Sequence, residues 1–173
     1  MSVQATYLGM SLAIDDLDVE NLAYFKHCAE HNFHLQRCTK CNLLRYPPTT
    51  ACPWCMNGKS DWVPVEAKGA VHSYTEVHHA IQPAFKAATP YLVLLVDLDT
   101  QKGKPTKDEA LRVMGNLTTA DGKLAPPDMV KKVGVGTRVR MVFADAGPGL
   151  AIPHWTIDEG APQPAKPWRY PQE

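Results

Sequence analysis

The chain has 173 residues, enough for one sizeable core and a small satellite, and its 15 prolines and 11 glycines favour short strands and turns over a helical bundle. Basic and acidic residues number 18 each, so the zero net charge gives no electrostatic basis for binding a phosphate backbone. Neither a secretory signal nor an apolar run of ~20 residues is present. We therefore expect a mostly β, cytoplasmic protein of two small domains that does not bind membranes.

The N-terminal segment, residues 1–32, is expected to hold one helix. Residues 1–14 have no clear period, but Asp15-Asp16 can cap a helix over about residues 17–31. Its apolar stripe should pack beside the domain that follows, with Cys28 close to the stripe as a small hydrophobic group. The stripe is formed by Leu22, Phe25 and Ala29. His27, His31 and His34 lie near the helix end, where cations are favourable.

Two Cys-x-x-Cys pairs, separated by ten residues, dominate the next segment, residues 33–61. Each pair can direct two thiolates at one centre, and the spacer allows a hairpin that brings the second pair opposite the first. The pattern predicts a zinc ribbon, with Zn²⁺ held by Cys38, Cys41, Cys52 and Cys55. Two disulfides or an iron site remain as alternatives. Four protein ligands leave no open position, so the metal should be structural.

Residues 62–158 read as five strands with a short helix between the third and fourth. The first, third and fourth strands alternate apolar and polar residues, whereas the second is apolar almost throughout and should be central and covered on both faces. Pro126-Pro127 opens the helix. This order is that of an OB-fold, a small Greek-key barrel. The expected strands are 69–81, 91–99, 111–117, 137–145 and 150–157.

Aromatic side chains near loops and the terminus are the candidates for a partner interface. Phe85 lies in a proline-flanked loop, residues 82–90, that should carry it away from the barrel. The Pro-rich tail, residues 159–173, cannot form a core alone, so an ordered tail must be held by the barrel, a second copy or another subunit. The candidate interface residues are Phe85, Tyr91, Trp155, Trp168 and Tyr170.

No arrangement of residues with specific catalytic chemistry stands out. His78 and His79 are adjacent on a strand and point to opposite faces, so they cannot easily serve one centre. Asp97 and Asp99 share a face but end an apolar strand, where a solvated turn is expected. Taken alone, the chain does not look like an enzyme.

Several motifs in order resemble a known family of small proteins with an N-terminal rubredoxin-like zinc ribbon and a C-terminal OB-fold. The resemblance covers about residues 17–157 and leaves out the tail. It rests on Arg37-Cys-x-x-Cys-x₁₀-Cys-Pro-x-Cys with Tyr46-Pro-Pro, Gly69-x-Val-x-Ser-Tyr-Thr, Pro90-Tyr-x-Val-x-Leu-Val-Asp-Leu-Asp and Gly115-Asn-Leu.

The resemblance implies a zinc-containing accessory subunit, without catalytic residues of its own, in a hetero-oligomer with a thiolase-like enzyme. Such complexes make or break a carbon–carbon bond in an acyl-CoA, for example in the degradation of steroid side chains or aromatic acids. A CoA thioester would then be the substrate of the complex. The alternative is an OB-fold that binds single-stranded nucleic acid, with Tyr74 and His72 stacking on bases. The basic cluster near the barrel comprises Lys131, Lys132, Arg138 and Arg140.

Overall fold

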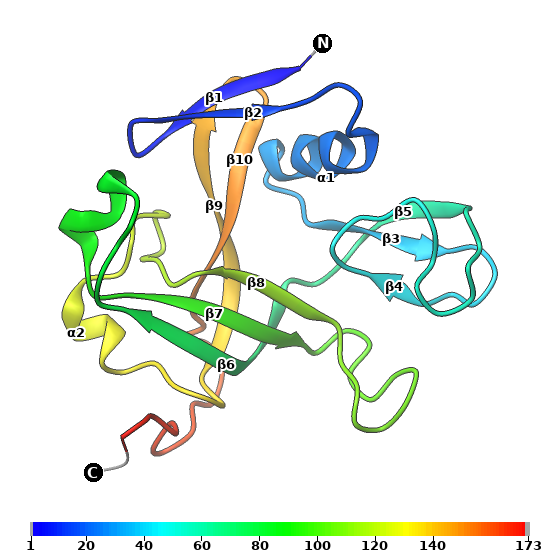
Figure 1. The fold of residues 1–173 in the computed structure, drawn as a ribbon. Coiled ribbons are helices and arrows are strands. Elements are labelled where there is room, and N and C mark those ends of the chain that lie inside the picture. The colour runs from blue at the N-terminus through cyan, green and yellow to red at the C-terminus, as the bar shows by residue number, and fades with distance from the viewer. Residues whose placement is uncertain (1, 172–173) are drawn as a thin grey trace.

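The computed structural model describes residues 2–171, which form three antiparallel sheets and two short α-helices (Figure 1). No helix among these residues is long and apolar enough to cross a membrane. The elements are β1 (Val3–Tyr7), β2 (Met10–Ile14), α1 (Val19–Ala29), β3 (His34–Cys38), β4 (Leu44–Arg45), β5 (Ser60–Pro64), β6 (Lys68–Val77), the 3₁₀ helix η1 (Pro83–Ala88), β7 (Tyr91–Leu98), β8 (Arg112–Asn116), α2 (Pro127–Val130), β9 (Arg138–Gly147) and β10 (Leu150–Ile157).

The five-stranded sheet has the order β10-β9-β6-β7-β8, and each strand is antiparallel to its neighbours. A parallel bridge between Leu117 and Trp155 brings the end of β8 beside β10 and closes the sheet into a barrel. The helix α2 lies between β8 and β9 in the chain. The five strands and the intervening helix predicted from the sequence are therefore confirmed. The first strand ends at Val77, short of the predicted Ile81, as the chain bends toward η1.

Alternating residues of β7 fill the centre of the barrel. Leu92, Leu94, Val96 and Leu98 are fully buried, whereas the residues between them remain partly exposed. The strand is central, but the expectation that both its faces are covered is wrong. At Gly69 on β6, a Cβ would lie 2.1 Å from the carbonyl oxygen of Asp97 on β7. Only glycine therefore permits the two paired strands to approach so closely at this position.

The helix α1 lies between the ribbon and the barrel and packs on β3, β9 and β10 (Figure 1). It is shorter than predicted, because Asp18 rather than Asp15-Asp16 caps it and accepts a hydrogen bond from the Asn21 N–H at 3.3 Å. Its fully buried residues are Tyr24 and Cys28, one turn apart, while the predicted stripe is only half-buried. Burial raises the pKa of the Cys28 thiol to about 12, consistent with the packing role expected for it.

The N-terminal hairpin of β1 and β2 was not foreseen. Leu8 and Gly9 form its two-residue turn, and both have positive φ, as type I′ turns require. Every second residue of each strand is partly buried, and β1 packs on β9 and β10. The alternation in residues 3–7 and 10–14, on either side of a residue followed by glycine, is the signal that could have revealed it.

The ribbon is a three-stranded sheet of order β4-β3-β5. Arg45 is almost completely buried inside it and donates to the Gln36 side chain at 2.8 Å, the Thr49 carbonyl and the Ser60 hydroxyl. The strand β5 crosses the domain boundary predicted between residues 61 and 62, since Trp62 and Val63 pair with β3. The ribbon sheet thus extends to Pro64.

Candidate metal centre and partner surface

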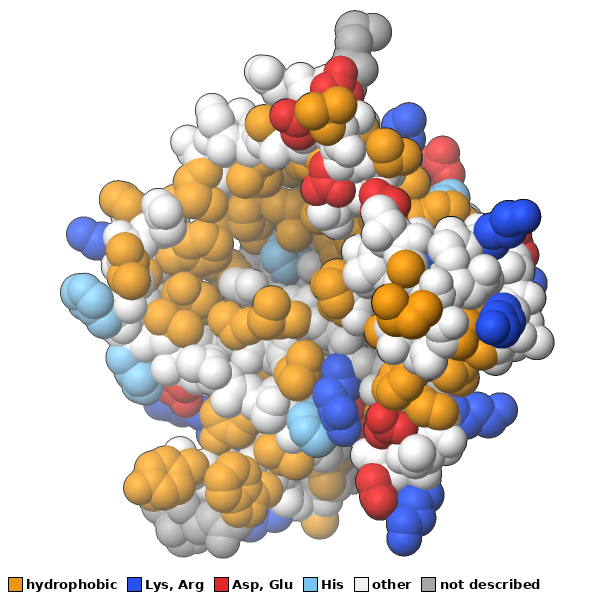
Figure 2. Space-filling model, turned by 45° about the vertical axis from the view of Figure 1, so that its right-hand side comes forward, with side chains coloured by type: hydrophobic (Ala, Val, Ile, Leu, Met, Phe, Trp, Pro, Cys, Tyr) orange, Lys and Arg blue, Asp and Glu red, His pale blue; other side chains and the backbone are white. Residues whose placement is uncertain are grey.

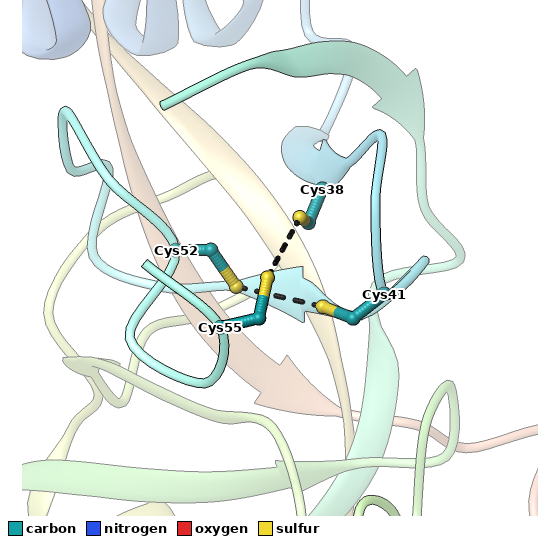
Figure 3. Close-up of side chains that lie close together, drawn as sticks. All are labelled: Cys38, Cys41, Cys52 and Cys55. Carbon is teal, nitrogen blue, oxygen red and sulfur yellow. Dashed lines mark hydrogen bonds between the residues drawn. The ribbon is translucent and has the colours of Figure 1, made fainter. Parts of the chain in front are cut away.

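Four cysteine side chains converge at one end of the ribbon (Figure 3). All four Sγ atoms lie within 4.8 Å of one another; Cys38 and Cys55 are 3.5 Å apart and Cys41 and Cys52 3.6 Å apart. A tetrahedron of sulfurs about 2.3 Å from a central Zn²⁺ has edges of roughly 3.8 Å, so the spacing fits this metal. The sequence prediction that these four residues form one cluster is confirmed.

The two Cys-x-x-Cys segments have the same backbone geometry. In the first, the Cys38 carbonyl accepts from the Asn42 N–H at 3.0 Å, and in the second the Cys52 carbonyl accepts from the Met56 N–H at 2.9 Å. Asn42 and Met56 both have φ of 60°, so each segment turns through a left-handed residue directly after its second cysteine. This repeated turn holds each pair of thiols on the same side of its loop.

Hydrogen bonds from the ribbon favour the ionised form of the first cysteine. The backbone N–H of Cys41 and the side-chain amide of Asn57, which lies 3.5 Å from the Cys38 Sγ, lower the pKa of Cys38 to about 5. Four adjacent thiols cannot all ionise without a cation, because the thiolates would repel one another. A divalent metal removes this repulsion, and the donor set therefore fits zinc.

The histidines near α1 lie apart from the cysteine cluster and contact one another or the barrel. The rings of His27 and His34 stack with centroids 4.1 Å apart. The imidazole of His31 lies 2.7 Å from a carboxylate oxygen of Asp145 and stacks on Phe143, which links the end of α1 to β9. Within residues 2–171, the four cysteines form the sole group of side chains with metal-ligating geometry.

The predicted interface residues separate into three environments. Phe85 does not project from the barrel; it is half-buried in η1, between the rings of Tyr7 at 6.5 Å and Tyr91 at 5.2 Å between centroids. Trp155 is fully buried in the barrel core, so its assignment to a partner surface is wrong. Both faces of β10 are covered, by the barrel on one side and by α1 and β1 on the other.

Trp168 and Tyr170 lie on the tail, which the barrel itself holds. Trp168 pairs with Val135, and the Tyr170 N–H donates to the Tyr74 hydroxyl at 2.9 Å. The Arg169 guanidinium donates to the carbonyls of Val130, the last residue of α2, and of Val133, and it pairs with Glu76. A cleft of about 430 Å³ opens between this tail and β6. The two aromatic rings remain 47% and 80% exposed.

One face of the molecule is hollowed between the hairpin and the barrel and is lined largely by hydrophobic side chains, with a histidine in its depth (Figure 2). Half-exposed apolar residues occupy the outer face of β7, and Met114 on β8 is 58% exposed. His154 on β10, which the sequence reading did not single out, is buried and shares a 3.0 Å hydrogen bond with the Tyr7 hydroxyl. Its position among apolar residues of the strand offers no sequence pattern that would have marked it as a buried histidine.

Polar groups considered for catalysis or nucleic-acid binding are engaged with one another. Asp97 pairs with Arg112 at 2.9 Å and His72 at 3.2 Å, and Asp99 receives both terminal nitrogens of Arg138. The Arg169 guanidinium lies 5.1 Å from the centre of the Tyr74 ring. One face of the Tyr74 ring and one member of the basic cluster, Arg138, are therefore engaged within the chain.

A model of the ChsH2 C-terminal OB-fold domain matches residues 62–144. The solved structure "Ltp2-ChsH2(DUF35) aldolase" overlaps 83% of this chain and 98% of its own, at 29% identity and a TM-score of 0.64. The chain belongs to the DUF35/ChsH2 family. Members combine an N-terminal four-cysteine cluster with a C-terminal OB-fold, which is the arrangement found here.

A curated relative from Thermomonospora curvata is 35% identical over 136 residues and is described as a probable enoyl-CoA hydratase alpha subunit. The match takes in 78% of this chain but 36% of the relative. The chain thus corresponds to about a third of that protein.

Proposed function

We propose that this DUF35/ChsH2-family protein is a non-catalytic, zinc-containing accessory subunit of a thiolase-like enzyme that acts on an acyl-CoA. The reaction would cleave or form a carbon–carbon bond, as in steroid side-chain or aromatic-acid degradation. The observation that carries the proposal is the likeness to the Ltp2-ChsH2(DUF35) aldolase over nearly the whole of that chain. The relative described as an enoyl-CoA hydratase subunit supports the acyl-CoA context.

The role proposed for zinc is structural. Cys38, Cys41, Cys52 and Cys55 would supply all four ligands, which leaves no open position for a substrate. Bound there, the metal would crosslink two loops of a ribbon that has few core residues of its own. The ribbon in turn would give α1 a rigid surface to pack on.

The hollow face and the tail are the surfaces we propose for the partner subunit. Phe85 and Tyr91 contribute half-buried rings beside the hollow, and Trp168 and Tyr170 contribute exposed rings at the tail. Aromatic anchors that are already held in place lose little side-chain freedom on binding. The thiolase-like subunit would supply the nucleophile and the acid–base groups of the reaction.

Elemental analysis tests the metal. Protein purified without chelator should contain one equivalent of zinc per chain, and substituting the ligand Cys52→Ser should abolish it. Cys28→Ser, which changes the buried cysteine outside the cluster, serves as the control and should retain the metal. Less than about half an equivalent of zinc in the wild type, or an iron chromophore, would contradict the assignment.

Coexpression tests the partner. The chain should copurify with a thiolase-like protein encoded beside it, and acyl-CoA cleavage or condensation should require both subunits. Each subunit should be assayed alone and then together, over a series of acyl-CoA substrates. Full activity from the partner alone, or no stable complex with any such protein, would remove the proposed function.

A further inference from the structure

The side chain of Gln101 joins the barrel to the metal-binding ribbon. Its Oε1 accepts from the Leu44 N–H at 2.6 Å and its Nε2 donates to the Leu44 carbonyl at 3.0 Å. The amide thus pairs with β4 as a neighbouring strand residue would. Leu44 belongs to the ribbon, whereas Gln101 lies 57 positions further along, in the loop between β7 and β8 that runs below the ribbon in Figure 1.

The residue next to Leu44 contacts both cysteines of the first Cys-x-x-Cys segment. The Leu43 carbonyl accepts from the Cys38 N–H at 3.0 Å, and the Leu43 N–H donates to the Cys41 sulfur. A displacement of β4 would therefore change the positions of two of the four thiols. Gln101 is thus connected to the metal-binding loop through the backbone of Leu44 and Leu43.

The loop of residues 99–110 is built around Gln101. Gln101 has φ of 68°, a left-handed conformation that costs energy for a residue with a Cβ and needs support from its surroundings. Its carbonyl accepts from the Lys104 N–H at 3.2 Å, and the Gly103 N–H donates to the Glu109 carbonyl at 2.7 Å. Because these hydrogen bonds connect the residues of the loop to one another, the position of Gln101 determines the conformation of the whole loop.

We propose that Gln101 is a positioning residue that couples the four-cysteine metal centre to the loop of residues 99–110. Metal in the ribbon holds β4 where Gln101 can pair with it, which keeps the loop in its observed conformation. The loop in turn holds β4 and slows the loss of the metal. The inference rests on the proposed zinc site, but not on the proposed partner.

Limited trypsin digestion of the zinc-loaded and zinc-free proteins, both kept reduced, measures how well the loop of residues 99–110 is protected from cleavage. Cleavage after Lys102 and Lys107 should be about tenfold faster without zinc, the ratio expected for losing two hydrogen bonds. Lys104 is followed by Pro105 and resists trypsin. Lys131 and Lys132, beyond α2, are internal controls whose cleavage rate should not change.

The variant Gln101→Asn separates this coupling from general unfolding of the ribbon. Asparagine tolerates the left-handed backbone, but its side chain is one methylene too short to pair with both Leu44 groups. Loaded with one equivalent of zinc, it should lose protection after Lys102 and Lys107, while Arg37, Lys40 and Lys59 in the ribbon remain protected. It should also release zinc to the chelating dye 4-(2-pyridylazo)resorcinol about tenfold faster than the wild type.

Asp108→Ala, an exposed change in the same loop, is the matched control and should behave as the wild type in zinc release and in cleavage after Lys102. Wild-type rates of zinc release and loop cleavage in Gln101→Asn would overturn the coupling. Zinc bound at one equivalent, with equal loop protection when it is removed, would overturn it as well. Failure of the wild type to bind any zinc would instead remove the metal site on which it depends.

Discussion

His154 is the residue whose environment departs furthest from that of a histidine in water. It is 3% exposed, and its Nδ1 has no hydrogen-bond partner among the described residues, while its other ring nitrogen faces the Tyr7 hydroxyl. Burial lowers the pKa of His154 to about 4, so the ring is neutral at physiological pH. The uncharged imidazole is therefore part of the packing between β10 and the N-terminal hairpin.

We expect this histidine to destabilise the protein in acid. The unfolded chain binds a proton to His154 below about pH 6.5, whereas the folded chain does so only near pH 4, so stability falls as the pH falls between these values. From pH 7 to pH 5 the loss amounts to about 2 kcal/mol. Urea unfolding at the two pH values measures it.

The comparison with His154→Phe isolates the effect. This variant should lose about 2 kcal/mol less than the wild type between pH 7 and pH 5, since it has no proton to take up at that site. His78→Asn, which removes a largely exposed histidine, should keep the wild-type dependence. Equal pH dependence in wild type and His154→Phe would show that the buried ring does not govern acid stability.

Individual side chains were predictable where spacing alone constrains them. The four cysteines had to meet, because two short Cys-x-x-Cys loops joined by a hairpin leave few other arrangements. Trp155 was misassigned because an aromatic residue can equally fill a core or a surface. Alternation along β10 could not decide between them, because both faces of this strand are covered and Trp155 lies on the face that packs in the barrel core.

At the scale of elements, the tail acts as a strap, and the Arg169 side chain anchors its C-terminal part. Arg169 places its guanidinium against two backbone carbonyls and the Glu76 carboxylate, with about a fifth of the side chain exposed. Close contact extends to Gly134, where a Cβ would lie 2.3 Å from the Trp168 carbonyl oxygen. The strap thus fits tightly against the segment between α2 and β9.

Arg169→Ala should release this strap. The change leaves two carbonyls and a carboxylate without their donor, at a cost of roughly 1 to 3 kcal/mol in unfolding free energy. Hydrogen exchange should increase in residues 160–171 and remain unchanged in β7. The control is Lys132→Ala, a change to an exposed cation in the segment that the tail packs against. Wild-type exchange in the Arg169 variant would mean that other contacts hold the tail.

The strands of the barrel were predictable because alternation reports which face is buried, and the barrel buries one face of most strands. The position of helix α1 in the chain was predicted correctly, but the face of the helix that is buried was not. Its apolar residues extend around much of its circumference, so the ribbon and the barrel, not the sequence pattern, decide that Tyr24 and Cys28 point inward.

At the scale of the whole molecule, the aromatic side chains beside the hollow should decide partner binding. If Phe85 is a central anchor of the proposed interface, Phe85→Ala should weaken association with the thiolase-like subunit by about 1 to 3 kcal/mol. Titration of the purified subunits measures this. Leu17→Ala, a change at an 87% exposed apolar residue before α1, should have no effect. Unchanged affinity in Phe85→Ala would exclude this surface.

Because of helix α1, the unit that folds is longer than the segment that the family model matches. The family match begins at Trp62, yet a barrel cut there would expose the side of β10 on which α1 lies and would lose Tyr7 from beside His154. The ribbon would lose Tyr24, whose ring packs against Phe33 and Tyr46. Because α1 packs on both the ribbon sheet and the barrel, we expect that a chain lacking residues 1–61 would not form a stable barrel.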